Sequence, residues 1–84
     1  MKRIRDEENQ KSLNICGKNI RKARLAARLT QKQLSEKLET MAIYICRGSV
    51  SRIESGDRII TDIELKAIAH ILNVSIESLF FNTQ

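Results

Sequence analysis

Apolar residues recur at helical spacing along most of the chain, and this pattern predicts five helices. The predicted helices cover about residues 15–27, 30–41, 47–56 and 61–72, with a short fifth helix after Ser75. The one alternating stretch contains Met41, Ile43 and Ile45, and an isolated strand there would have nothing to pair with. The pattern therefore indicates an all-α fold.

Each predicted helix has an apolar face that can join a common core. The residues expected to face inward are Ile20, Ala23, Ala27, Leu34, Leu38, Val50, Ile53, Ile63, Ala67, Ile68, Ile71, Leu72, Ile76, Leu79 and Phe80. Between the second and third helices we expect a lengthened connection in which Ile43 and Ile45 plug the core. Tyr44 would then face outward, near the start of the third helix.

Residues that satisfy free backbone groups mark the predicted helix ends. Thr30 with Gln33, and Thr61 with Glu64, have the spacing of capping boxes. Gly56 can end the third helix in the left-handed region. Further candidate end signals are Asn14, Asn73 and Ser75. These signals agree with the apolar periodicity on where the helices begin and end.

The third predicted helix, RGSVSRIESG at residues 47–56, has the composition of a helix that reads DNA. Val50 and Ile53 share one apolar face, and the side chains pointing elsewhere are Arg47, Ser49, Ser51 and Arg52. A short helix that docks through small apolar residues and presents arginine and serine outward is typical of a major-groove reader. Gln31, at the first position of the preceding helix, would lie where backbone N–H groups and the helix dipole attract a phosphate.

Charge is distributed unevenly over a chain whose 84 residues suffice for one small domain with net charge +5. The basic residues Lys18, Arg21, Lys22, Arg24, Arg28 and Lys32 occur between positions 15 and 34 without an acidic residue. Such a stretch can meet a polyanion, although a solvated helix face is the alternative. We expect a flexible charged arm at residues 1–14, the domain at 15–81 and a short tail at 82–84.

The sequence contains no pattern that predicts catalysis or a metal site. Cys16 and Cys46 are isolated from each other and from the single histidine, His70. We expect both cysteines to be reduced, with a disulfide between them as the alternative. No nucleophile elbow, phosphate-binding glycine loop or HExxH motif is present, so we predict neither an enzyme nor a cofactor nor a small-molecule ligand. Without a membrane-spanning run or a signal-peptide core, a soluble cytoplasmic protein is expected.

Three phrases in order resemble the Cro and phage-repressor class of helix-turn-helix proteins, the XRE-like family. They read IRKARLAARLTQKQLSEKL, VSRIESGDR and ELKAIAHILNVSIESLF, and the resemblance covers about residues 15–81. It implies a compact five-helix, lambda-repressor-like DNA-binding domain whose second and third helices form the helix-turn-helix. The link between those helices is longer than the usual turn and resembles a subset with a long, isoleucine-punctuated link.

The resemblance also implies roles for individual residues. Those implied to read bases are Arg47, Gly48, Ser49, Ser51 and Arg52. Those implied to hold phosphates are Thr30, Gln31 and Arg58, to which we add the basic Lys18 and Arg21. Arg24 lies at the edge of an apolar stripe and needs a carboxylate, and the family pattern implies a structural ion pair with Glu54. Cys46 stands where a serine or threonine cap is common, and a thiol caps poorly.

These features predict a sequence-specific regulator of transcription, most simply a repressor, that binds double-stranded DNA. One small domain makes few contacts, so we expect a homodimer on a two-fold operator. The candidate dimer contacts are Leu79, Phe80 and Phe81, unless Phe81 only folds over the end of the domain. The alternative function is a protein-interaction or antitoxin-like module that uses the same fold.

Overall fold

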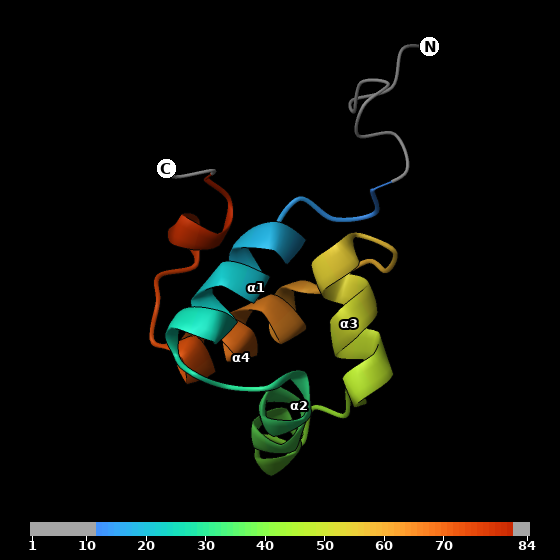
Figure 1. The fold of residues 1–84 in the computed structure, drawn as a ribbon, viewed down its shortest axis with the longest axis vertical. Coiled ribbons are helices and arrows are strands. Elements are labelled where there is room, and N and C mark those ends of the chain that lie inside the picture. The colour runs from blue at the N-terminus through green and yellow to red at the C-terminus, as the bar shows by residue number, and fades with distance from the viewer. Residues whose placement is uncertain (1–11, 82–84) are drawn as a thin grey trace, which may run out of the picture.

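The computed structural model describes residues 12–81, which contain four α-helices and one turn of 3-10 helix (Figure 1). The elements are α1 (Gly17–Ala26), α2 (Gln31–Thr40), α3 (Arg47–Ser55), α4 (Asp62–Leu72) and η1 (Glu77–Leu79). The prediction of an all-α fold is confirmed for this part of the chain. The prediction of five helices is wrong, because the fifth is only a 3-10 turn. Its Ser75 and Ser78 side chains bond to nearby backbone groups, a local pattern that competes with a longer helix.

The core forms where the apolar faces of all five elements meet. Helix α3 packs against α1 and α2, α4 packs against the same two helices, and η1 covers α1. The buried apolar residues are Cys16, Ile20, Leu34, Leu38, Ile45, Val50, Ile53, Leu65, Ala67, Ile68, Ala69, Leu72 and Leu79. Figure 1 shows α2 at one end of the molecule and η1 near the other, with α3 along one side. One side of α3 is therefore fixed by the core while the other faces outward.

Four predicted core positions are exposed, and two of them, Ile76 and Phe80, flank η1 with exposed fractions of 39% and 44%. Ile63 is 68% exposed, because it lies on the same face of α4 as the exposed His70, seven residues further on. The buried stripe of α4 instead includes Leu65 and Ala69, which the sequence pattern did not single out. Ala27 is also exposed, since α1 ends at Ala26 and the chain turns away through Arg28, whose φ is 62°.

The capping predictions are confirmed at the starts of α2 and α4. The Thr30 hydroxyl accepts from the Gln33 N–H at 3.0 Å, and the Gln33 side chain accepts from the Thr30 N–H at 2.8 Å. Thr61 and Glu64 form the same reciprocal pair. Gly56, with φ 85°, ends α3 in the left-handed region, where a side chain would be strained.

The link between α2 and α3 follows the predicted alternation. Ile45 is buried and Ile43 partly buried, whereas Tyr44 is 77% exposed. The Ser35 hydroxyl of α2 donates to the Ile45 carbonyl at 2.6 Å, which fixes the link just before α3 begins. The long connection is therefore anchored at both isoleucines.

The expected boundary between a flexible arm and the domain at residue 15 is wrong. The Leu13 N–H donates to the Gly56 carbonyl at 2.7 Å, and the Asn14 side chain bonds to the end of α3 and the loop after it. Residues 12–14 therefore belong to the folded domain. The remainder of the predicted arm, residues 1–11, and the tail at 82–84 lie outside the described residues.

Candidate nucleic-acid interface

Helix α3 has one face turned into the domain and one turned to solvent. Val50, Ile53 and Glu54 are buried. The predicted base-reading residues lie on the other side: Ser49 is half-buried, and the exposed ones are Arg47, Gly48, Ser51 and Arg52. The structure thus brings the five residues together on one exposed helix face.

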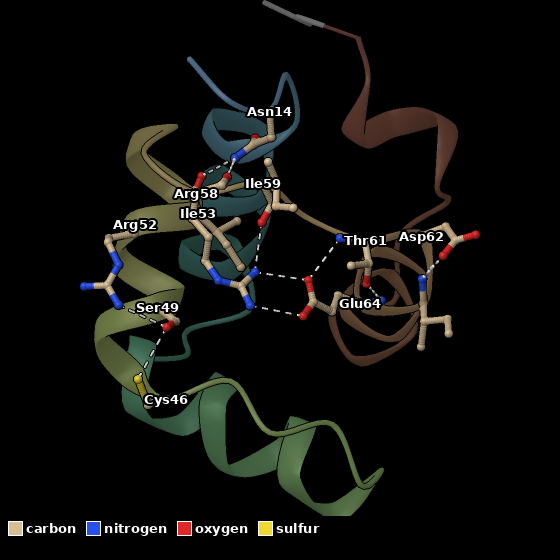
Figure 2. Close-up of polar contacts among 11 residues, drawn as sticks. Asn14, Cys46, Ser49, Arg52, Ile53, Arg58, Ile59, Thr61, Asp62 and Glu64 are labelled. Carbon is tan, nitrogen blue, oxygen red and sulfur yellow. Dashed lines mark hydrogen bonds and ion pairs between the residues drawn. The ribbon is translucent and has the colours of Figure 1, made fainter. Parts of the chain in front are cut away.

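A row of polar groups runs along this face toward the start of the helix. An Arg52 terminal nitrogen donates to the Ser49 hydroxyl at 3.2 Å, and the Cys46 thiol donates to the same oxygen at 3.5 Å. Figure 2 shows this row along the outer side of α3.

The hydrogen bond with Ser49 lowers the pKa of the Cys46 thiol. Cys46 forms no side-chain cap to the helix backbone, as its sequence position predicts.

A buried ion pair braces α3 against α1 and α2. Arg24 donates to the two carboxylate oxygens of Glu54 at 2.6 and 3.0 Å, and both residues are only 6% exposed. Gln31, the first residue of α2, donates to the same carboxylate at 3.0 Å. A third nitrogen of Arg24 donates to the Leu29 carbonyl at 2.8 Å. The Glu54 charge is thus bonded by two other helices, which fixes how α3 sits between them.

The start of α1 packs directly on the end of α3. Gly17 lies so close to α3 that a Cβ at this position would overlap the Ile53 carbonyl oxygen. The Asn14 amide oxygen accepts from the Cys16 and Gly17 N–H groups, while its nitrogen donates to the Ile53 and Arg58 carbonyls. One side chain therefore joins the start of α1 to the end of α3. The sequence indicates Asn14 only as a helix cap, because its distant partners leave no periodic signal.

Residues 20–79 match the sequence profile of a helix-turn-helix family. The chain belongs to the Cro and C1 type of this family. The matched region contains most of α1 and the whole of α2, α3, α4 and η1. No curated protein and no solved structure is significantly similar to the chain. Membership in this family indicates a DNA-binding domain of a transcriptional regulator.

The predicted phosphate-binding residues lie at the start of α2, on α1 and in the loop after α3. The Thr30 hydroxyl is used as a cap, and the Gln31 amide nitrogen bonds to Glu54. The capping box engages the Thr30 and Gln33 N–H groups, so the N–H groups of Gln31 and Lys32 between them are the ones left for an anion. Lys18 and Arg21 are exposed on α1.

Arg58 has a partner, Glu64, that no sequence pattern indicates. Its two terminal nitrogens donate to the Glu64 carboxylate at 3.1 and 3.2 Å, and one also donates to the Ile59 carbonyl at 2.9 Å (Figure 2). Hydrogen bonding from Arg58 lowers the pKa of Glu64. The pair joins the loop after α3 to the capping box of α4, so the Arg58 fork is already engaged.

The candidate dimer contacts require one correction. Leu79 is only 1% exposed and belongs to the core, so its side chain has no surface to offer a partner. Phe80 and Phe81 are 44% and 62% exposed. The Asn19 side chain of α1 donates to the Leu79 and Phe81 carbonyls at 3.0 and 2.8 Å, which fixes this turn against α1.

The described residues contain neither a group of potential metal ligands nor a helix long and apolar enough to cross a membrane. Cys16 is buried and Cys46 exposed, and both are free. The disulfide that the sequence left as an alternative is therefore not formed. Burial raises the pKa of the Cys16 thiol, which keeps it protonated in the core.

Proposed function

We propose that this domain binds double-stranded DNA sequence-specifically by placing the exposed face of α3 in the major groove. The observation that carries the proposal is the division of α3 into two faces. Val50, Ile53 and Glu54 hold it in the domain, while arginine and serine side chains are exposed on the other side. Because buried residues already fix the position of α3, the helix can enter a groove without a change in the protein's conformation. This reduces the entropic cost of binding.

Arg47 and Arg52 are the proposed base readers. Each can donate two hydrogen bonds to O6 and N7 of guanine, and such a pair discriminates against other bases by roughly 1 to 3 kcal/mol. Ser49 and Ser51 can bond to either kind of base edge. Gly48 has no side chain, so the helix backbone can approach the bases closely there. We therefore propose a half-site that contains guanine.

Phosphate contacts are proposed for the start of α2 and the basic face of α1. Lys18 and Arg21 contribute their side chains. The helix start at Thr30 and Gln31 contributes the Gln31 backbone N–H and the helix dipole, because the Thr30 hydroxyl and the Gln31 amide are engaged within the domain. Arg58, which the resemblance implied as a further phosphate ligand, is left out because both of its terminal nitrogens bond to Glu64. Such contacts fix the position of the protein on the duplex, whereas base contacts supply the sequence preference.

The proposed regulator acts as a homodimer and represses transcription. A single domain of this size makes few base contacts, whereas two domains related by two-fold symmetry read half-sites about one helical turn apart. The exposed neighbours Phe80 and Phe81 supply apolar surface for the dimer contact. Size-exclusion chromatography of the Phe81→Ser variant tests this, because loss of the contact converts the dimer to a monomer. A monomeric wild type would contradict the dimer.

Salt dependence distinguishes DNA binding from a protein-interaction module built on the same fold. We expect the affinity for a duplex selected from a random pool to fall on the order of 10³-fold between 50 and 200 mM salt if about six phosphates are contacted. Fluorescence anisotropy of the labelled duplex measures this. Failure to bind any duplex at 50 mM salt would contradict the proposed function.

A further inference from the structure

The long link between α2 and α3 presents one large side chain to solvent. Tyr44 is 77% exposed and lies two residues before Cys46, the N-cap of α3. Its hydroxyl has no hydrogen-bond partner among residues 12–81. Nothing in the domain itself therefore explains why an aromatic residue is held here.

The direction of Tyr44 follows from its neighbours. Ile43 and Ile45 face the core, and the Ile45 carbonyl is held by Ser35 at 2.6 Å. Alternate residues of an extended segment point to opposite sides, so Tyr44 and Cys46 share the outer side of the link. Both are exposed, as this alternation requires.

Cys46 connects this outer side to the exposed face of α3. Its thiol reaches the Ser49 hydroxyl at 3.5 Å, and that hydroxyl accepts from Arg52 at 3.2 Å. Figure 2 shows the three side chains in one row along α3. Tyr44 therefore extends the row by one side chain beyond the start of the helix.

We propose that Tyr44 donates a hydrogen bond from its hydroxyl to a DNA phosphate that borders the bases read by α3. This inference rests on the proposed function. In a helix-turn-helix complex the first helix crosses the phosphate backbone and the N-terminal residues of the second contact base edges. A link between those helices passes the phosphates at the wall of the groove. A tyrosine there meets the ligand that such side chains commonly bind in protein–DNA complexes.

The proposed contact differs in kind from those of the basic residues. A phenol is neutral, so it bonds to a phosphate without releasing a condensed counterion. Its loss therefore weakens binding at every salt concentration by the same factor. Loss of Lys18 or Arg21, in contrast, would make the salt dependence less steep by about one contact.

Removal of the hydroxyl alone tests the proposal. We expect Tyr44→Phe to weaken binding to the selected duplex and to an unrelated duplex alike, by about tenfold. The slope of log affinity against log salt should stay at the wild-type value. His70→Ala, an exposed position on α4, is the control and should bind as wild type does. Wild-type affinity in Tyr44→Phe would overturn the proposal.

A second experiment observes Tyr44 directly in the protein without substitutions. The sequence has one tyrosine, so protein labelled with 3-fluorotyrosine gives a single fluorine resonance. We expect saturating duplex to shift it, and an unshifted resonance would overturn the contact. These failures differ from failure of the DNA proposal, in which wild-type protein would bind no duplex at low salt.

Discussion

The two ends of α3 are held in different ways. At its C-terminal end, Asn14, Gly17 and the Leu13 N–H pack on the last carbonyls, and Glu54 is bonded by Arg24 and Gln31. At its N-terminal end, Cys46 gives no side-chain cap to the helix backbone, and Gly48 is exposed, where an added Cβ would contact only the Arg52 side chain. Before the helix, the link is held by the bond from Ser35 to the Ile45 carbonyl and by the buried Ile45 side chain.

This difference separates positioning from recognition within one short helix. Buried charge and close backbone contacts fix the C-terminal end, so the angle of α3 is set by α1 and α2. The N-terminal end leaves the Arg47 side chain exposed to a ligand. Substitutions of the buried contacts should therefore reduce stability, whereas substitutions of the exposed Arg47 and Arg52 should reduce DNA binding.

The largest expected effect is on stability, at the buried ion pair. Arg24→Ala leaves the Glu54 carboxylate buried without its main partner, and we expect a loss of about 3 to 5 kcal/mol in the free energy of unfolding. Urea titration followed by circular dichroism measures it. Arg58→Ala is the matched control, because its more exposed pair with Glu64 contributes less than about 1 kcal/mol.

A double variant, measured by the same urea titration, shows whether Arg24→Ala loses stability through an unpaired charge or through lost packing. The double variant Arg24→Met with Glu54→Leu removes both charges, and we expect it to recover most of the lost stability. A double variant as unstable as Arg24→Ala would show that packing, rather than the unpaired charge, accounts for the effect. If Arg24→Ala and Arg58→Ala lost the same free energy of unfolding, the buried pair of Arg24 with Glu54 would be no more important to stability than the exposed pair of Arg58 with Glu64.

Asn14→Ala should cause the next largest effect. It removes four hydrogen bonds that join α1, α3 and the following loop, and we expect a loss of about 2 kcal/mol. Asn19→Ala serves as control, since that side chain donates its two hydrogen bonds to the Leu79 and Phe81 carbonyls rather than to α3. If the two variants were equally stable, the idea that residues 12–14 hold α3 in place would be wrong.

Cys46→Ser should change stability at the N-terminal end of α3, where the helix lacks a side-chain cap. The backbone of Cys46 is extended, with φ −71° and ψ 165°, as a capping residue requires, but its side chain forms no cap. A serine hydroxyl can accept from the N–H groups of the first turn, so we expect a gain of about 1 kcal/mol in unfolding free energy. Thermal unfolding measures this gain, and a loss of stability would show that the sulfur packs more favourably than its exposure suggests.

The smallest effect is the acid response of the Arg58 and Glu64 pair. Arg58 lowers the pKa of Glu64 in the folded protein, so the pair stabilises the fold above the ordinary glutamate pKa. That contribution is lost as pH falls through the lowered pKa. We therefore expect wild type to exceed Arg58→Ala in stability at pH 7, by less than about 1 kcal/mol, and the difference to vanish near pH 2. A difference that persists at pH 2 would contradict an electrostatic origin.

Local signals predicted much of the fold. Capping boxes, Gly56 and the isoleucines of the link were correct because each depends on residues a few positions apart. The exposed and buried sides of α3 followed from helical spacing for the same reason. The exposure of Ile63 was not predicted, because it depends on which side of α4 meets α1 and α2 rather than on hydrophobicity.

Long-range polar contacts were the features that sequence patterns could not supply. Asn14 bonds to residues about forty positions away, and nothing in its neighbourhood indicates those partners. Arg58 was assigned to phosphate by its place in a family pattern, whereas the fold brings it to Glu64. Arg24 was an exception, since a guanidinium beside an apolar stripe requires a buried acceptor, and the family pattern then implied Glu54.

Selection of bound duplexes from a random pool, carried out with wild type and Arg52→Ala in parallel, tests most directly whether the exposed face of α3 reads DNA. We predict a two-fold symmetric consensus containing guanine for wild type. Arg52→Ala should lose the preference at one position in each half-site and keep the others. An identical consensus for the two proteins would contradict the account.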